Sequence, residues 1–259
     1  MSEVEGKKLK RKDYLFIFLV FGLAFTTLII IILELTWDKI CNDVIHWEKT
    51  LTRELVECFL RAALIEETFK FLGFILARRK YKINRVSDSM FAAGLVGLMY
   101  GIVEKAVLFN PMAIIINIFF LMHLLWQWNQ GRHFQIAIDE NKKGNKGKAF
   151  LHMFIATFVI FFIHGVWDAL LSIAAYLMDD KNGIANGEAY GAIILGATLL
   201  FGVIYTIITF IITIKTARKS KRENVESEGK IETTADTEAV DTKTEEDTKS
   251  KEDKENLKE

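Results

Sequence analysis

The sequence predicts an all-α, polytopic membrane protein, a helix bundle of about six transmembrane helices with both termini on the cytoplasmic side. Three observations predict this fold class. Hydrophobic residues make up 51% of the 259 residues and gather in long runs. Lysine and arginine concentrate on alternate connections between the runs. Ionisable side chains recur inside the runs, where each needs a partner or a water-filled cavity.

Each expected span is a predominantly apolar run long enough to cross about 30 Å of hydrocarbon as a helix. The first run is too long for an ordinary cleaved signal peptide, so we expect it to remain as a membrane anchor. The segment 38–57 is amphipathic and is expected to lie along the outer interface. Pro111 after Asn110 predicts a tight turn that makes a hairpin of the third and fourth spans. The six expected spans are 14–36, 58–77, 88–109, 112–130, 149–176 and 190–214.

The flanking charges predict the orientation. Lysine and arginine are dense before the first span and in 78–85, 132–148 and 215–222, whereas the intervening connections carry few. Basic connections face the cytoplasm in most membrane proteins. We therefore expect a multi-pass protein of the cell membrane with both termini in the cytoplasm.

The chain is expected to have three parts. Residues 1–13 form a basic cytoplasmic N-terminus, and 14–217 form the transmembrane helical domain. The remaining residues, 218–259, form a charged cytoplasmic tail. Within it, residues 223–259 carry 14 acidic and 6 basic side chains, a net charge of −8, which leaves +8 for the rest of the chain. The tail has few apolar residues and cannot bury enough surface to offset its ordering entropy, so we predict that it is disordered.

Ionisable residues at membrane depth point to a functional site. Small residues mark the faces where membrane helices approach one another, and Glu104 follows Gly97 by seven residues on such a face. His164 and Asp168 are neighbours at i, i+4. The ionisable residues expected inside the spans are Glu66, Glu67, Lys70, Glu104, Lys105, His123, His152, His164 and Asp168.

Two interpretations of these residues remain open from the sequence. Glu66 or Glu67 with Lys70 is either a self-neutralising ion pair or a catalytic pair in which one carboxylate serves as a base. Likewise, His164 with Asp168 is either a hydrogen-bonded pair that locks the fifth helix in place or an oriented imidazole whose second nitrogen serves a water, a metal or an oxyanion.

The motifs EETFK at 66–70, a glycine-rich helix ending in Glu104, a helix carrying His123, and HGVWD at 164–168 follow one another on four consecutive expected helices. This order resembles the PrsW family of intramembrane proteases, distantly related to the CAAX-processing membrane proteases. The resemblance implies an intramembrane endopeptidase. It also implies a single-span membrane protein as substrate, such as an anti-sigma-factor-like regulator. The active-site residues that it implies are Glu66, Glu67, Glu104, His123, His164 and Asp168.

The family is classed with metalloproteases, whereas its distant relatives have been argued to activate water with glutamate and histidine alone. His123 and His164 are candidate zinc ligands, and zinc is the candidate cofactor. Our hypothesis makes Glu66 the general base on a water held with the two histidines. In this hypothesis, Asp168 orients His164 and Lys70 controls the carboxylate pair.

Two other functions remain as alternatives. Intramembrane glutamate, histidine and aspartate also serve ion relays, so an ion- or proton-coupled transporter is the first. The second is a catalytically inactive PrsW-like scaffold, because Lys105 stands where the family has an asparagine. We find no glycine-rich phosphate loop, serine nucleophile motif or nucleic-acid-binding signature, and no nucleic-acid partner is expected.

Overall fold

The computed structural model describes residues 9–48, 50–108, 120–216 and 218–219. Their regular structure is helical, and no strand occurs among them, which confirms the all-α class. The predicted hairpin at Pro111, the first part of the fourth span and nearly all of the predicted disordered tail lie outside these residues. The chain divides into two units, Met1–Thr213 and Ile214–Glu259, and the fold below is that of the first.

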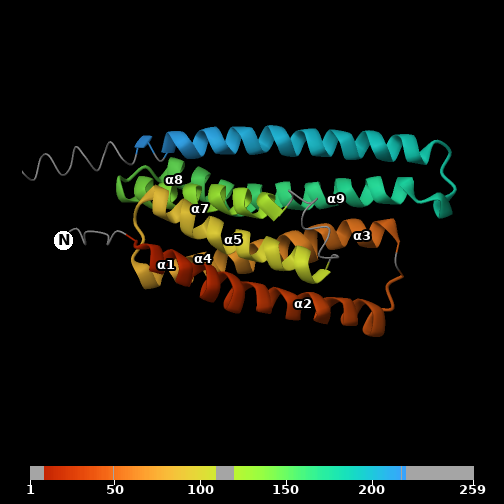
Figure 1. Ribbon diagram of the computed structural model, residues 1–259, viewed down its shortest axis with the longest axis horizontal. Helices are drawn as coiled ribbons and strands as arrows, with labels where there is room; N and C mark the ends of the chain where they lie inside the picture. The colour runs from red at the N-terminus through yellow and green to blue at the C-terminus, as the bar shows by residue number, and fades with distance from the viewer. Residues whose placement is uncertain (1–8, 49, 109–119, 217, 220–259) are drawn as a thin grey trace, which may run out of the picture. The chain divides into compact units, whose positions relative to one another are not determined.

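Several helices run without a break through α-helical and wider π-helical segments. Figure 1 shows their continuous ribbons. The first runs from Arg11 to Val44 and the second from Leu51 to Tyr81. The segments in chain order are α1 Arg11–Phe16, η1 Ile17–Thr27, α2 Leu28–Lys39, η2 Ile40–Val44, α3 Leu51–Glu57, η3 Cys58–Ile65, α4 Glu66–Tyr81, α5 Val86–Leu108, α7 Phe120–Lys142, α8 Lys146–Phe154, η4 Ile155–Val159, α9 Ile160–Met178, the 3₁₀ turn η5 Asp180–Asn182, and a last helix over Gly187–Thr216.

The chain is a polytopic helical membrane protein. Four described helices are long and apolar enough to cross a bilayer: Arg11–Val44, Val86–Glu104, Lys146–Met178 and Gly187–Thr216. Large apolar side chains such as Ile32, Leu35 and Ile193 are more than half exposed, as expected of surfaces that face lipid. The two other expected spans, 58–77 and 112–130, carry most of the polar residues discussed below. The count of six spans stays a prediction.

The interfacial position expected of the segment 38–57 stays a prediction, and the structure describes the helices within it. The first helix continues through this segment to Val44, and a new helix begins at Leu51. The buried side chain of Arg53 joins the two helices. It donates hydrogen bonds to Glu57 Oε1 at 2.7 Å, to Asn42 Oδ1 at 2.9 Å and to the carbonyl oxygen of Trp47. These bonds tie the start of the second helix to the end of the first.

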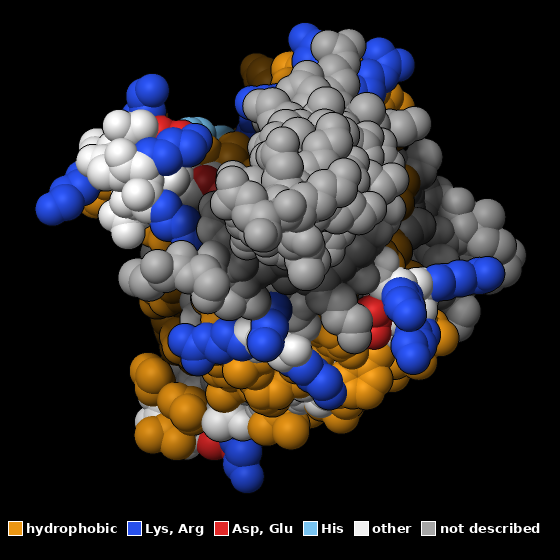
Figure 2. All heavy atoms as spheres, turned by 90° about the vertical axis from the view of Figure 1, so that its left-hand side faces the viewer, with side chains coloured by type: hydrophobic (Ala, Val, Ile, Leu, Met, Phe, Trp, Pro, Cys, Tyr) orange, Lys and Arg blue, Asp and Glu red, His pale blue; other side chains and the backbone are white. Residues whose placement is uncertain are grey.

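One end of the bundle gathers the basic residues. The Tyr14 hydroxyl donates to Asp88 Oδ1 at 3.2 Å, so the start of α1 lies beside the start of α5. The Ser89 hydroxyl donates to Gln135 Oε1 at 3.1 Å, which brings the second half of α7 to the same end. Figure 2 shows lysine and arginine side chains around this end. Within the first unit, the connections at 78–85 and 132–148 therefore lie at the same end as the start of α1, as the positive-inside pattern requires.

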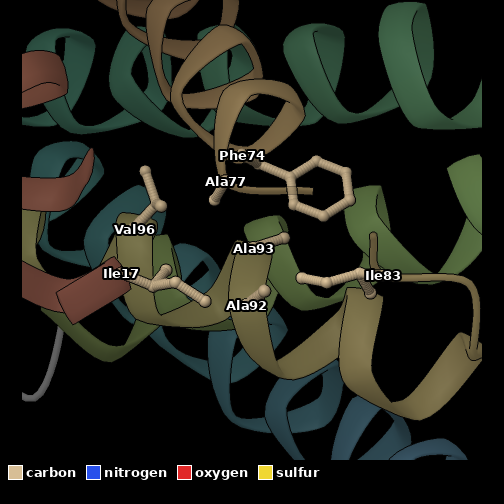
Figure 3. Close-up of a cluster of buried hydrophobic side chains, with 7 residues drawn as sticks. All are labelled: Ile17, Phe74, Ala77, Ile83, Ala92, Ala93 and Val96. Atoms are coloured by element: carbon tan, nitrogen blue, oxygen red, sulfur yellow. The ribbon is translucent and has the colours of Figure 1, made fainter. Parts of the chain in front are cut away.

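Small residues let the first helix, α4 and α5 pack closely. Figure 3 shows the buried apolar cluster in which η1, α4, the turn after α4 and α5 meet. Helix packing in membranes favours such small side chains because they bring backbones together. The members of the cluster are Ile17, Phe74, Ala77, Ile83, Ala92, Ala93 and Val96.

Gly97 sets the approach of α5 to α7, which lie side by side (Figure 1). A Cβ atom at Gly97 would collide with the carbonyl oxygen of His123 and with the side chain of Gln127. The absence of a side chain at position 97 therefore brings the polar stretch of α7 directly against α5.

Candidate active site

Two glutamates and two histidines form a buried cluster in the interior of the bundle. Glu66 and Glu67 come from the first turn of α4, His123 from α7 and His164 from α9. One ligand atom from each of the four side chains lies within 4.8 Å of the others. The four side chains are between 2% and 5% exposed. Sequence positions almost a hundred residues apart therefore converge on one point, as the helix faces predicted.

Lys70 lies at the centre of this cluster and is fully buried. Its ammonium nitrogen is 3.1 Å from Glu66 Oε2, 2.7 Å from Glu67 Oε1 and 3.1 Å from His123 Nδ1. Consecutive helical residues point about 100° apart. Lys70 follows Glu66 by four positions and Glu67 by three, so its side chain points between the directions of the two glutamates. Lys70 therefore contacts both of them.

His164 is held between two carboxylates. Its Nδ1 lies 2.8 Å from Glu67 Oε1 and its Nε2 lies 3.2 Å from Asp168 Oδ2. The Trp126 ring stacks on the imidazole with a centroid distance of 4.3 Å. A doubly protonated ring would donate to both carboxylates in this geometry. The nitrogen expected to serve a water or a metal is thus engaged by Glu67.

His123 has a partner at each ring nitrogen. Lys70 can only donate, so His123 Nδ1 accepts from it, and the protonated Nε2 donates to Glu104 Oε2 at 2.9 Å. Glu104 therefore joins the cluster through His123, on the side of α5. The Tyr100 ring lies edge-on to the imidazole at 5.2 Å and keeps it in place.

Gln127 and two aromatic residues complete the site. Gln127 is fully buried, and its Nε2 donates to Glu67 Oε2 at 2.6 Å. The sequence could have indicated Gln127, because it lies one turn after His123 on the same face of the helix. Trp126 and Tyr100 carried no such signal, because aromatic residues in a membrane helix usually serve packing.

The structure thus brings together all seven predicted site residues, although Asp168 and Glu104 lie at the more exposed border of the cluster. His152 lies elsewhere, at the basic end, with its Nδ1 at 2.8 Å from Nδ1 of His133. The side chain of Lys105 lies outside the described part of the chain.

The His133 side chain gives a pH-dependent contribution to stability. Burial and the neighbouring Arg132 lower the pKa of His133 to about 4, from an ordinary value of about 6.5. The folded state therefore binds fewer protons, so stability should fall as the pH drops from about 6.5 towards 4, by about 1–3 kcal/mol. Thermal unfolding in detergent at pH 7 and pH 5 should show a smaller pH effect for His133→Gln. His46→Gln, at an exposed position, is the control and should behave as wild type.

The fold and the cluster define a class of protein: a polytopic helical membrane protein that encloses carboxylates, imidazoles and an ammonium group within its bundle. Comparison with protein families then identifies the family. Residues 10–183 match the family described as PrsW family intramembrane metalloprotease, and the chain belongs to this family. The match confirms the resemblance seen in the motifs and covers every residue of the cluster. No curated protein and no solved structure matches the chain.

Proposed function

We propose that this protein is an intramembrane endopeptidase that hydrolyses a peptide bond of a single-span membrane protein, such as an anti-sigma-factor-like regulator. The observation that carries the proposal is the buried convergence of Glu66, Glu67, His123 and His164 within 4.8 Å. Buried carboxylates and imidazoles at one point supply both a base and an acid. Membership of the PrsW family supports the same class of reaction.

In the proposed mechanism, Glu66 is the general base. It accepts one hydrogen bond from Lys70 at 3.1 Å and lies 4.0 Å from His164 Nε2. Glu67 is held more tightly by Lys70, His164 and Gln127. Glu66 takes a proton from water as the water oxygen attacks the scissile carbonyl carbon. When the C–N bond breaks, the leaving nitrogen receives a proton from the His164 imidazolium, which Asp168 orients.

The donor types of the cluster fit a metal ion. Carboxylates and imidazoles are ligands of catalytic zinc, and the residues that would hold it are Glu66, Glu67, His123 and His164. Bound zinc would lower the pKa of a water and polarise a carbonyl. Without the ion, Glu67 and Asp168 orient His164 and Glu104 orients His123, so each imidazole would exchange one of these contacts for the metal.

We also propose that the basic end of the bundle faces the cytoplasm, which would place both termini there and leave the tail 218–259 as a disordered cytoplasmic segment. The charge pattern supports this orientation. Labelling of a cysteine added at an exposed position, Lys142→Cys at the basic end or Asn182→Cys at the opposite end, tests it against the background of the two buried native cysteines, Cys41 and Cys58. A membrane-impermeant reagent added to intact cells should label only Asn182→Cys.

Cleavage of membrane substrates tests the function directly. We would co-express the wild type, Glu66→Gln and His164→Ala with a panel of tagged single-span membrane proteins. The wild type should release a fragment, and both variants at equal protein level should release less than about 1% of it, since general acid–base catalysis contributes about 10²–10⁴-fold. Glu54→Gln, at an exposed position of α3, should cleave as wild type.

Fragments that persist unchanged in both variants would refute the assigned residues. Ion flux into liposomes without any substrate would instead favour the transporter alternative. A folded wild type that cleaves no member of the panel, carries no flux and still associates with membrane partners would favour the inactive scaffold.

Gln127 should act as a positioning residue. Gln127→Leu keeps the volume of the side chain but removes the donor to Glu67 Oε2, so we expect the cleavage rate to fall about 10–100-fold, as for groups that orient catalytic residues. The loss should fall on kcat rather than on KM, because the substrate keeps its contacts. Gln130→Leu, equally buried on α7, is the matched control. Equal losses in the two variants would indicate a packing role alone.

A further inference from the structure

We propose that the Lys70 ammonium group is the resident cation of the Glu66, Glu67, His123 and His164 cluster, so that Lys70 and a divalent metal ion exclude each other there. The inference concerns the site of the proposed function and deepens it. Lys70 would then be the group that balances the negative charge of the cluster, whichever substrate the protein cleaves.

The contacts of Lys70 carry the argument. Its nitrogen touches Glu66, Glu67 and His123 at 2.7–3.1 Å, and these are three of the four side chains that could hold a metal. An ammonium group has three hydrogens, and three acceptors surround this one. Lys70 therefore occupies the position that a metal ion would take, and its positive charge balances the negative charge of the carboxylates.

The histidines support the same conclusion. A metal needs a ring nitrogen with a free lone pair. His123 Nδ1 faces the Lys70 ammonium and its Nε2 faces Glu104, whereas both nitrogens of His164 face carboxylates. Each ring would have to release one of these partners before it could bind a metal.

Lys70 also cannot extend its ammonium group to the aqueous phase at the basic end of the bundle. It is fully buried, and 11 residues of α4 separate it from Tyr81 at the basic end of the helix, about 16 Å at 1.5 Å per residue. A lysine side chain is too short to cross that distance and reach the headgroup region. The Tyr100 ring, 4.4 Å from the nitrogen, further stabilises the cation in place.

Metal content of the purified protein tests the inference. The wild type, Lys70→Met and the exposed control Lys142→Met would be purified in detergent without a histidine tag, equilibrated with zinc, dialysed and measured by plasma mass spectrometry. We expect the wild type and Lys142→Met to retain under about a tenth of a zinc ion per chain, and Lys70→Met to retain about one. Zinc titration should show binding to Lys70→Met about 100-fold tighter or more, because a like charge has been removed. Adding Glu67→Gln to Lys70→Met should abolish the retained metal.

Two results would overturn the inference. One is a wild type that itself retains about one metal ion per chain, and the other is a folded Lys70→Met protein that retains no more than the wild type. If Lys70→Met does not purify as a single species, Lys70→Gln replaces it. The metal content of the wild type decides in either case. Fragment release is measured separately. A wild type that cleaves substrate and retains metal would refute this inference alone. A metal-free wild type that cleaves nothing would refute the proposed function alone.

Discussion

Glu67→Gln is expected to reduce substrate cleavage by about 100-fold or more, through electrostatics and orientation together. Glu67 lies 2.7 Å from the Lys70 nitrogen, 2.8 Å from His164 Nδ1 and 2.6 Å from Gln127 Nε2. The substitution removes the charge that balances Lys70. A glutamine amide cannot satisfy all three donors, since it carries only one acceptor oxygen. Initial rates of fragment release in proteoliposomes, at matched protein content, measure the effect.

A double substitution separates the charge of Glu67 from its shape. Glu67→Gln combined with Gln127→Glu returns one carboxylate and one amide to the same contact. We expect the double variant to recover thermal stability lost in Glu67→Gln and to cleave at least about tenfold faster than Glu67→Gln. The reason is that a carboxylate and an amide again share the contact between positions 67 and 127. Glu54→Gln on α3 is the control for loss of a glutamate charge. Wild-type cleavage by Glu67→Gln would remove Glu67 from the mechanism.

The helical membrane fold could be predicted because it depends on patterns local to the sequence. Long apolar runs such as Arg11–Val44 and Lys146–Met178 appear directly in the order of residues. What could not be predicted is where a helix continues. The end of the first helix depends on the hydrogen bonds of Arg53 to Asn42 and to the Trp47 carbonyl, which join residues from two helices.

The candidate site was predictable for a related reason. A charged side chain inside an apolar run needs a partner. The positions of Glu66, Lys70 and His164 within such runs therefore indicated a site. Their partners were not all predictable. Gln127 is a neutral residue and Trp126 an apolar one, so neither has an unusual cost at that depth, and only the packing of α7 against α4 and α9 shows their contacts.

Gly97→Ala should destabilise the protein and also impair the site. A Cβ atom at position 97 collides with the His123 carbonyl oxygen, which belongs to the backbone and cannot rotate away. Either α5 and α7 separate or His123 shifts, and overpacking of this kind costs about 1–3 kcal/mol. Because His123 touches Lys70 and Glu104, a shift of about 1 Å should lower the cleavage rate by about 100-fold. Thermal unfolding in detergent and fragment release at low temperature measure the two effects.

Gly196→Ala is the matched control, since it also places a methyl group on a membrane helix, but nothing lies within 4 Å of a Cβ atom there. It should unfold and cleave as wild type. The two glycines then differ in one physical respect, the distance to the neighbouring helix. If Gly97→Ala unfolded at the same temperature as Gly196→Ala, α5 and α7 would not be in contact at His123. The placement of that histidine beside Glu104 and Lys70 would then be wrong. A loss of cleavage in Gly97→Ala at temperatures where the protein remains folded would show that the spacing of the two helices sets the geometry of the cluster.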